Sequence, residues 1–110
     1  MYLYAIIHHH LIFVGWNMEE KQIESKLVKA VKAREGMCLK FVSPGFDGVP
    51  DRIVLLPGGR LAFVETKATG KKMRPLQKFR KRQLERLGFL VFCLDNEEDI
   101  GDIIDEIQSV

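Results

Sequence analysis

The sequence has little cysteine, and its two cysteines, Cys38 and Cys93, lie far apart in the chain. Without a close pair of cysteines, or histidines beside them, they make neither a disulfide framework nor a zinc-binding motif. Both fall within apolar, strand-like runs, where a free cysteine behaves as a small buried hydrophobic residue. The simplest interpretation is that the protein works in a reducing cytoplasm.

The sequence also lacks the marks of export and of membrane insertion. Residues 1–16 are rich in Tyr, Leu, Ile, Phe and Val, but this run is too short to span a bilayer. It has neither the positively charged start nor the small-residue cleavage site of a signal peptide. We therefore expect no membrane partner.

The role of residues 1–17 stays open. Three consecutive histidines interrupt the segment at positions 8–10, but adjacent residues of a helix or strand point in different directions, so we do not expect them to share a metal ion. The segment is an extra strand, an association surface, or an upstream extension from a mistaken start codon, since Met18 opens a natural helix. We expect this hydrophobic extension to precede a domain over residues 18–110.

There is no internal repeat and no low-complexity tract, and 110 residues are enough for a single hydrophobic core. An apolar content of 46% with 29% charged residues is typical of an ordinary globular protein. Charge is unevenly distributed, although the net charge is only +2. Residues 71–86 are strongly basic, and residues 95–106 are acidic with no lysine or arginine. The basic band fits a surface that binds a polyanion, and it fits equally well a solvated helix face.

Hydrophobic periodicity and turn residues predict the order helix, three strands, helix, strand, helix, and therefore an α/β fold. In the second helix, the spacing puts Leu76, Phe79, Leu84 and Leu87 on one apolar face. The expected elements are a helix from Met18 or Glu19, capped by Asn17 and ended by Gly36, strands over 37–42, 52–56 and 60–64, a helix from Pro75 to Gly88, a buried strand over 89–94, and a last helix from Glu97, capped by Asn96.

The stretch 50–67 is the most informative part of the sequence. Two apolar runs flank a Pro-Gly-Gly turn at residues 57–59, which predicts a β-hairpin. Side chains alternate along a strand, so Glu65 and Lys67 project on the same side. Asp51 sits at the start of the partner strand, where it can lie beside Glu65 across the ladder.

This arrangement has a definite chemistry. Two carboxylates that meet at a strand end are oxygen ligands of the kind that Mg²⁺ prefers. Lys67 can orient or deprotonate a water held by the cation, because a nearby cation and partial burial weaken the hold of an ammonium group on its proton. Such a set would activate a nucleophile and offset charge on an attacked phosphate. Glu-x-Lys alone is common on exposed strands, and it is Asp51 directly after Pro50, one strand earlier, that favours a site.

Neighbouring segments can contribute to the same site. Glu20 and Glu24 border the apolar stripe of the first helix, and each is either a solvated flank or an extra metal or water ligand. Gln77, in the first turn after Pro75, can turn its amide toward Glu65 and Lys67. The glycine- and proline-rich loop at 43–50 leads into the candidate site and is a plausible substrate-contacting segment.

Four spaced motifs then carry a family resemblance. They are Gly48-Val49-Pro50-Asp51-Arg52-Ile53, Phe63-Val64-Glu65-Thr66-Lys67-Ala68, Arg74-Pro75-Leu76-Gln77 and Leu87-Gly88-Phe89. In this order they resemble the VRR-NUC (virus-type replication-repair nuclease) domain of the PD-(D/E)xK nuclease superfamily, over about residues 18–107. The resemblance implies a restriction-endonuclease-like core, with a mixed central sheet flanked by helices in the order α-β-β-β-α-β-α.

The resemblance also implies a set of active-site residues. The catalytic set is Asp51, Glu65, Lys67, Gln77 and Glu24. Within it, Asp51 and Glu65 bind the divalent metal, Mg²⁺ with Mn²⁺ as a possible substitute, and the backbone carbonyl of Thr66 is a further ligand. Glu20 is a near alternative to Glu24 as the carboxylate of the first helix.

The implied activity is that of a metal-dependent, structure-specific DNA endonuclease acting on branched DNA such as Holliday junctions. Small stand-alone members from phages and prophages are similar in length and act as homodimers, and larger relatives belong to DNA repair nucleases, so the expected location is the cytoplasm of a bacterial or phage-infected host cell. The alternatives are a general or restriction-like endonuclease and a catalytically silent DNA-binding module. Phosphate contacts are expected from Lys71, Lys72, Arg74, Lys78, Lys81 and Arg82.

Overall fold

The computed structural model describes the backbone of residues 5–110 and the side chains of residues 18–110. The predicted order of elements is confirmed, with a short 3-10 helix, η1, added before the last helix. The elements are α1 (Ala5–Ala33), β1 (Met37–Lys40), β2 (Arg52–Leu56), β3 (Arg60–Thr66), α2 (Pro75–Arg86), β4 (Leu90–Leu94), η1 (Glu97–Asp99) and α3 (Ile100–Gln108).

The strands of the described region form a mixed sheet in the order β1-β2-β3-β4. β1, β2 and β3 are antiparallel neighbours, and the predicted hairpin joins β2 to β3 with Val54 opposite Ala62. Gly58 and Gly59 take positive φ in its turn, a conformation that is easy for glycine. β4 runs parallel to β3, because α2 carries the chain back across the sheet between them. The mixed α/β sheet expected from the sequence is therefore present.

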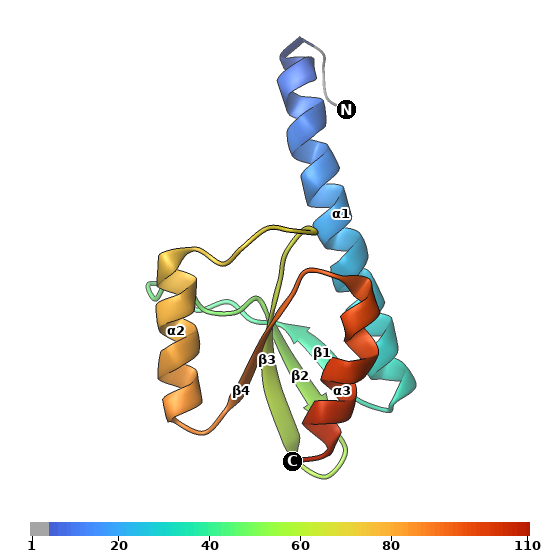
Figure 1. Cartoon of the computed structure of the whole chain (residues 1–110), viewed down its shortest axis with the longest axis vertical. Helices are drawn as coiled ribbons and strands as arrows, with labels where there is room; N and C mark the ends of the chain where they lie inside the picture. The colour runs from blue at the N-terminus through green and yellow to red at the C-terminus, as the bar shows by residue number, and fades with distance from the viewer. Residues whose placement is uncertain (1–4) are drawn as a thin grey trace.

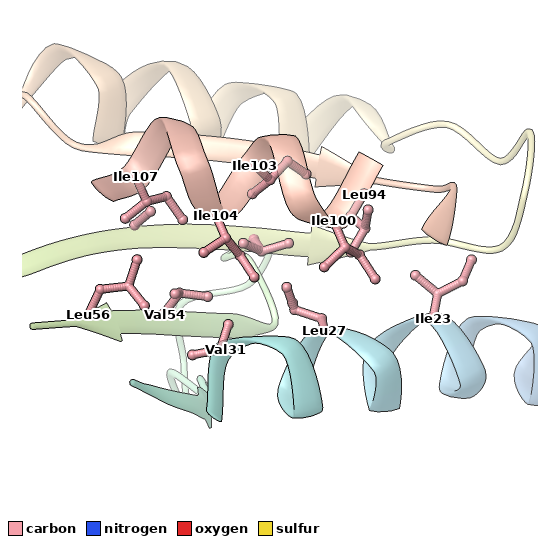
Figure 2. Packing of buried hydrophobic residues seen from close by; sticks show 12 residues of the cluster. Ile23, Leu27, Val31, Val54, Leu56, Leu94, Ile100, Ile103, Ile104 and Ile107 are labelled. Atoms are coloured by element: carbon pink, nitrogen blue, oxygen red, sulfur yellow. The ribbon is translucent and has the colours of Figure 1, made fainter. Parts of the chain in front are cut away.

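The helices cover the two faces of the sheet unequally. α1 and α3 lie on one face, and α2 lies alone on the other (Figure 1). The hydrophobic core fills the space between α1, α3 and the sheet, where Figure 2 shows their apolar side chains pointing toward one another. The buried members of this core are Ile23, Leu27 and Val31 of α1, Val54, Leu56, Ala62, Val64 and Leu94 of the sheet, and Ile100, Ile103, Ile104 and Ile107.

The start of the first helix differs from the prediction. α1 begins at Ala5, so Asn17 lies inside the helix and does not cap it, and an extra strand in this segment is wrong. The apolar run upstream of Met18 continues the helix, and the N-terminal part of α1 extends beyond the sheet (Figure 1). Residues 1–4 and the side chains of residues 5–17, with the three histidines among them, lie outside the described part.

The N-terminal cap of η1 is as predicted, because the Asn96 side chain accepts a hydrogen bond from the Glu98 amide at 3.0 Å.

The apolar stripe of α2 is also not buried as its periodicity predicts. Leu76 is 39% exposed, Phe79 42% and Leu87 73%, whereas the polar Gln77 is only 6% exposed. A single helix covers this face of the sheet, and it docks through the side that carries Gln77, so most of the stripe stays at the surface. The reason for this orientation is the contact that Gln77 makes, described below.

The cysteines are partly as expected. Cys38 is half-buried, but Cys93 is exposed because it lies on β4 at the edge of the sheet. Burial of each sulfur nevertheless raises the pKa of both thiols, that of Cys38 to about 11, so both stay protonated at neutral pH.

Within the described residues, no helix combines the length and the apolar character that crossing a membrane requires.

The core between α1 and the sheet should dominate the stability of the domain. Leu27 is completely buried, so Leu27→Ala should lower the free energy of unfolding by about 3 kcal/mol through lost burial and the cavity left behind. Val42 is 72% exposed, and Val42→Ala should change the free energy of unfolding by less than about 0.5 kcal/mol. Urea denaturation of both variants measures the difference, and similar small losses would contradict this packing.

Candidate active site

The β2–β3 hairpin brings Asp51 beside Glu65. The antiparallel register pairs Arg52 with Val64, so the next two residues toward the strand ends are Asp51 and Glu65. The backbone of Asp51 is also fixed from the other side, where the Phe41 amide donates to its carbonyl at 2.8 Å. Asp51 is half-buried and Glu65 is only 4% exposed. The predicted approach of the two acids across the hairpin is confirmed.

Thr66 holds both carboxylate oxygens of Asp51. Its backbone N–H donates to Oδ1 at 3.1 Å, and its hydroxyl donates to Oδ2 at 2.8 Å. Thr66 is completely buried, so this pair of hydrogen bonds fixes the orientation of the aspartate. A carboxylate oxygen can accept more than one interaction, so the hydrogen bonds leave room for a cation.

The Glu65 carboxylate has one satisfied and one unsatisfied oxygen. Oε2 accepts a hydrogen bond from the Gln77 side-chain amide at 2.8 Å and lies 3.3 Å from the Lys67 ammonium nitrogen. Oε1 is buried and has no hydrogen-bond partner among the described residues. Burying a charged carboxylate oxygen without a partner is costly, so this atom can take a ligand from outside the protein when Glu65 is ionised.

The orientation of the Gln77 amide is determined at both ends. Its carbonyl oxygen accepts from the Arg74 backbone N–H at 2.8 Å, so the amide nitrogen must point at Glu65. The hydrogen bond to Arg74 satisfies one of the free N–H groups at the start of α2. Gln77 therefore ties the first turn of α2 to the carboxylate, which explains why this helix docks through a polar side chain.

Burial favours the protonated, neutral form of Glu65 and Asp51. It raises the pKa of Glu65 to about 7, with the negative charge of Asp51 adding to the effect and Lys67 opposing it. Burial also raises the pKa of Asp51, against which the hydrogen bonds from Thr66 work. A group of acids with raised pKa values in one place is typical of a functional site.

The structure separates the two glutamates of α1. Glu24 is mostly buried, and its Oε2 accepts from the Arg52 guanidinium at 2.7 Å and from Lys40 at 3.3 Å. Glu20 lies one turn earlier on α1, where burial and the charge of Asp51 raise its pKa. The same helix contacts the chain just beyond Lys67, because Glu19 accepts from the Thr69 amide at 3.0 Å. Both glutamates therefore face the candidate site, since the charge of Glu24 adds to burial in raising the pKa of Asp51, but Glu24 is in addition held in an ion pair with Arg52.

The donor set fits a small divalent cation. Within residues 18–110, no three or more histidine, cysteine, aspartate or glutamate side chains gather as a metal-binding group. A cation would therefore have to be held by the two carboxylates of Asp51 and Glu65, with a carbonyl such as that of Thr66 and waters completing its shell. Mg²⁺ binds in this way, through one or two carboxylates while it keeps several waters. The unsatisfied Oε1 of Glu65 is the atom in this structure that fits such a ligand.

The basic residues named from the sequence fall in two places. Lys71, Lys72 and Arg74 are exposed on the connection from β3 to α2, beside the candidate site. Lys78, Lys81 and Arg82 lie on α2, with the Lys81 ammonium group 2.7 Å from Glu85.

Two contributions to the site were not foreseen. One is the Thr66 hydroxyl, which alternation places on the opposite side from Glu65 and which nevertheless reaches Asp51 at the end of the strand. The other is Arg52, which holds Glu24 and also donates to the Cys38 carbonyl at 3.2 Å. An arginine directly after the aspartate and a hydroxyl between glutamate and lysine are the only signals of these contacts in the sequence.

Comparison with known proteins supports a nuclease fold. No protein-family model matches the chain. A protein of Acyrthosiphon pisum secondary endosymbiont phage 1, described as "Putative nuclease p44", is 45% identical over 87 residues, which are 79% of this chain and 92% of the relative. A solved structure described as "VRR_NUC domain" superposes with a TM-score of 0.74 at 26% identity, over 79% of this chain and 95% of that one.

The raised pKa of Glu65 predicts how stability depends on pH. Its pKa is about 7 in the folded protein and 4.5 ordinarily, so between these values the folded state keeps a proton that the unfolded chain has lost. Without divalent metal, the free energy of unfolding should therefore fall as pH rises from about 5 to 8, by on the order of 2 kcal/mol.

Chemical denaturation at several pH values, with EDTA present, measures this slope. Glu65→Gln keeps the shape of the side chain and removes its titration, so the slope should become shallower. Adding Mg²⁺ at pH 8 should stabilise the wild type more than this variant. An unchanged slope in Glu65→Gln would contradict the assignment of the titration to Glu65.

Proposed function

The chain belongs to the VRR-NUC family of nucleases, and on that premise we propose that it is a divalent-metal-dependent, structure-specific DNA endonuclease. The observation that carries the metal dependence is the buried, unsatisfied Oε1 of Glu65 beside Asp51. The proposed substrate is branched DNA such as a Holliday junction, and the proposed place of action is the cytoplasm of a bacterial or phage-infected host cell.

In this proposal, Asp51, Glu65 and the Thr66 carbonyl hold Mg²⁺, for which Mn²⁺ can substitute. When bound, the cation would act as a Lewis acid toward the oxygens of the scissile phosphate. Thr66 and Gln77 keep the two carboxylates in place, so little reorganisation is needed when substrate arrives.

Lys67 is the group placed to act on the attacking water. Its ammonium nitrogen lies 3.3 Å from Glu65 Oε2, and its side chain is only 14% exposed. From there it can orient the water for in-line attack and offset the charge that builds on the phosphate. The bond from phosphorus to the 3′ oxygen breaks, which leaves a 5′-phosphate and a 3′-hydroxyl.

The basic residues flanking the site would bind the DNA backbone. Lys71, Lys72 and Arg74 precede α2, and Lys78, Lys81 and Arg82 follow on it, so a strand entering the site would run along these side chains. Contacts of this kind set affinity and salt dependence, and they carry no base sequence information. Recognition would then depend on the shape of the DNA.

A homodimer would suit this substrate. One site cuts one strand, and resolving a symmetric four-way junction needs two cuts related by symmetry, which a two-fold dimer supplies. Light scattering on the purified chain should give the mass of two copies. A monomer that cuts junctions at symmetric positions would remove dimerisation from the proposal.

Lys67→Ala should reduce cleavage by about a hundredfold or more, because it removes the group that acts on the water, while DNA binding stays close to that of the wild type. The assay incubates the protein with four-way junctions and with linear duplex, with Mg²⁺, with Mn²⁺ and with EDTA. Selective cutting of junctions is expected, and EDTA should stop it.

The same assay separates the alternatives. Equal cutting of both DNAs would indicate a general or restriction-like endonuclease, and binding without cutting would indicate a silent DNA-binding module. Persistent cleavage in Lys67→Ala would overturn the role of the lysine, and full activity in EDTA would overturn the metal.

The two glutamates of α1 can be distinguished by matched variants. Glu20→Gln should lower the cleavage rate about tenfold with little change in stability, because Glu20 lies toward Asp51 and Lys67. Glu24→Gln should lower the free energy of unfolding by about 1–3 kcal/mol, because it weakens the mostly buried pair with Arg52. Cleavage kinetics and urea denaturation of both variants make the comparison. A larger loss of cleavage rate in a well-folded Glu24→Gln would make Glu24 the active-site carboxylate.

A further inference from the structure

The surface formed by α2 and the loop before β2 carries exposed aromatic rings next to arginines. Phe46 is 46% exposed and Phe79 42%. The Arg80 guanidinium carbon lies 3.7 Å from the centroid of the Phe46 ring and 5.8 Å from that of Phe79, and the Arg82 guanidinium carbon lies 5.9 Å from that of Phe79. These four residues, Phe46, Arg80, Phe79 and Arg82, form an alternating row that we call the stacking row.

Arg80 pins this row in place. Its Nε donates to the Asp47 carbonyl at 2.7 Å, and its Nη1 donates to the Gln83 side chain at 2.9 Å, so the loop that carries Phe46 is held against α2. Gly48 completes the contact, because a β-carbon there would lie 2.7 Å from the Leu76 side chain. The Phe46 ring is therefore preorganised, with Arg80 stacked on it and about half of its surface accessible.

A cavity of about 350 Å³ lies next to the row, between α2 and this loop. Most of its lining is apolar, including Phe41, Val49 and Leu84. Its polar members are Ser43, Gln83 and Arg80, so the row itself forms part of the wall. This is within the range of volumes that hold small ligands, and apolar walls with a few polar groups are typical of such sites.

Two members of the row, Phe46 and Arg80, are connected to the candidate active site. The loop that carries Phe46 runs through Val49 and Pro50 directly into Asp51. On the other side, Arg80 follows Gln77, the residue that holds Glu65, by about one helical turn. The loop before β2 and the first turns of α2 therefore join the row to the two carboxylates by short connections.

The charge around the row favours a nucleic acid over a second copy of the chain. Arg80, Arg82 and the neighbouring Lys78 and Arg86 make this part of α2 basic, so two copies that met here would bring like charges together. Exposed aromatic rings within a basic groove are the arrangement that binds unpaired nucleotides, since every base has a face that stacks and a phosphate that needs a cation.

We propose that the stacking row binds an unpaired base of the DNA close to the scissile phosphate, with the base stacked on Phe46 and its edge at the adjoining cavity. This inference rests on the proposed action on DNA, and it requires a nucleotide whose base is unpaired. Such a nucleotide occurs at a single-stranded end, in the arm of a fork, or at the branch point of a four-way junction where a base pair has opened. Fully paired duplex offers no base to this surface.

The test uses the full chain in EDTA, so that binding is measured without cleavage. The probe is DNA with 2-aminopurine, placed in a short single strand, in the unpaired arm of a fork, or inside a fully paired duplex. The wild type should quench the fluorescence of the first two and not of the third. Phe46→Ala should abolish the quenching and weaken binding of the single strand about tenfold, while duplex binding changes by less than about twofold. Phe46→Tyr keeps the aromatic ring, so it should retain both the quenching and the binding of the single strand.

Met37→Ala serves as the matched control, because Met37 is 56% exposed at the far end of β1 and should not affect the probe. Circular dichroism melting confirms that each variant is folded. Unchanged quenching in Phe46→Ala would overturn the proposal, as would equal weakening for single strand and duplex. A change in mass by light scattering would assign Phe46 to self-association and would also overturn it.

Failure of this inference and failure of the proposed function give different results. If the stacking row is wrong but the nuclease is right, the wild type cuts DNA and Phe46→Ala binds single strands normally. If the nuclease is wrong but the row is right, no DNA is cut with any metal, and 2-aminopurine is still quenched by the wild type and by Lys67→Ala.

Discussion

The buried carboxylate of Glu65 is the constraint around which the rest of the structure is arranged. A carboxylate that is only 4% exposed is unstable unless its oxygens are matched, and here each neighbouring element supplies or prepares a match. α2 contributes the Gln77 amide, β3 itself contributes Lys67, and β2 brings a second acid at Asp51. One oxygen has no partner among residues 18–110, and it is the atom to which we assign the proposed cation.

Fold and site are joined by a small number of hydrogen bonds, because the site lies where several elements end. The hydrogen bond from the Thr66 hydroxyl to Asp51 connects β3 to the loop before β2, and the hydrogen bond from Gln77 to Glu65 connects β3 to α2. Arg80 then joins α2 back to the same loop. These contacts form a closed ring of elements around the carboxylates, and the helix that would contact DNA is part of that ring.

Much of this could be predicted from the sequence, because the informative patterns are local. Alternation along β2 and β3, with a glycine turn between them, was enough to place Asp51 beside Glu65 and Lys67. Patterns that depend on the third dimension were less reliable. The apolar stripe of α2 has a helical period, but the helix docks through Gln77 and leaves most of the stripe exposed. Cys93 lies in an apolar run, but that run forms an edge strand, so the cysteine is exposed and not buried. The contacts of Arg52 and of the Thr66 hydroxyl join segments far apart in the chain, and no spacing rule indicates them.

The pairing of Arg52 with α1 has a consequence for how the hairpin closes. Asp51 and Arg52 are adjacent in sequence but serve opposite purposes, one as part of the acidic site and the other as the partner of Glu24. If β2 slid by one residue against β3, the guanidinium would take the place of the aspartate, and Val54 and Leu56 would leave the core for the other face. Misalignment would then lose the ion pair, the hydrophobic contacts and the ligand position together. A hairpin in the wrong register would therefore be unstable as well as lacking the aspartate at the site, so the same contacts that hold the strands also select the correct alignment.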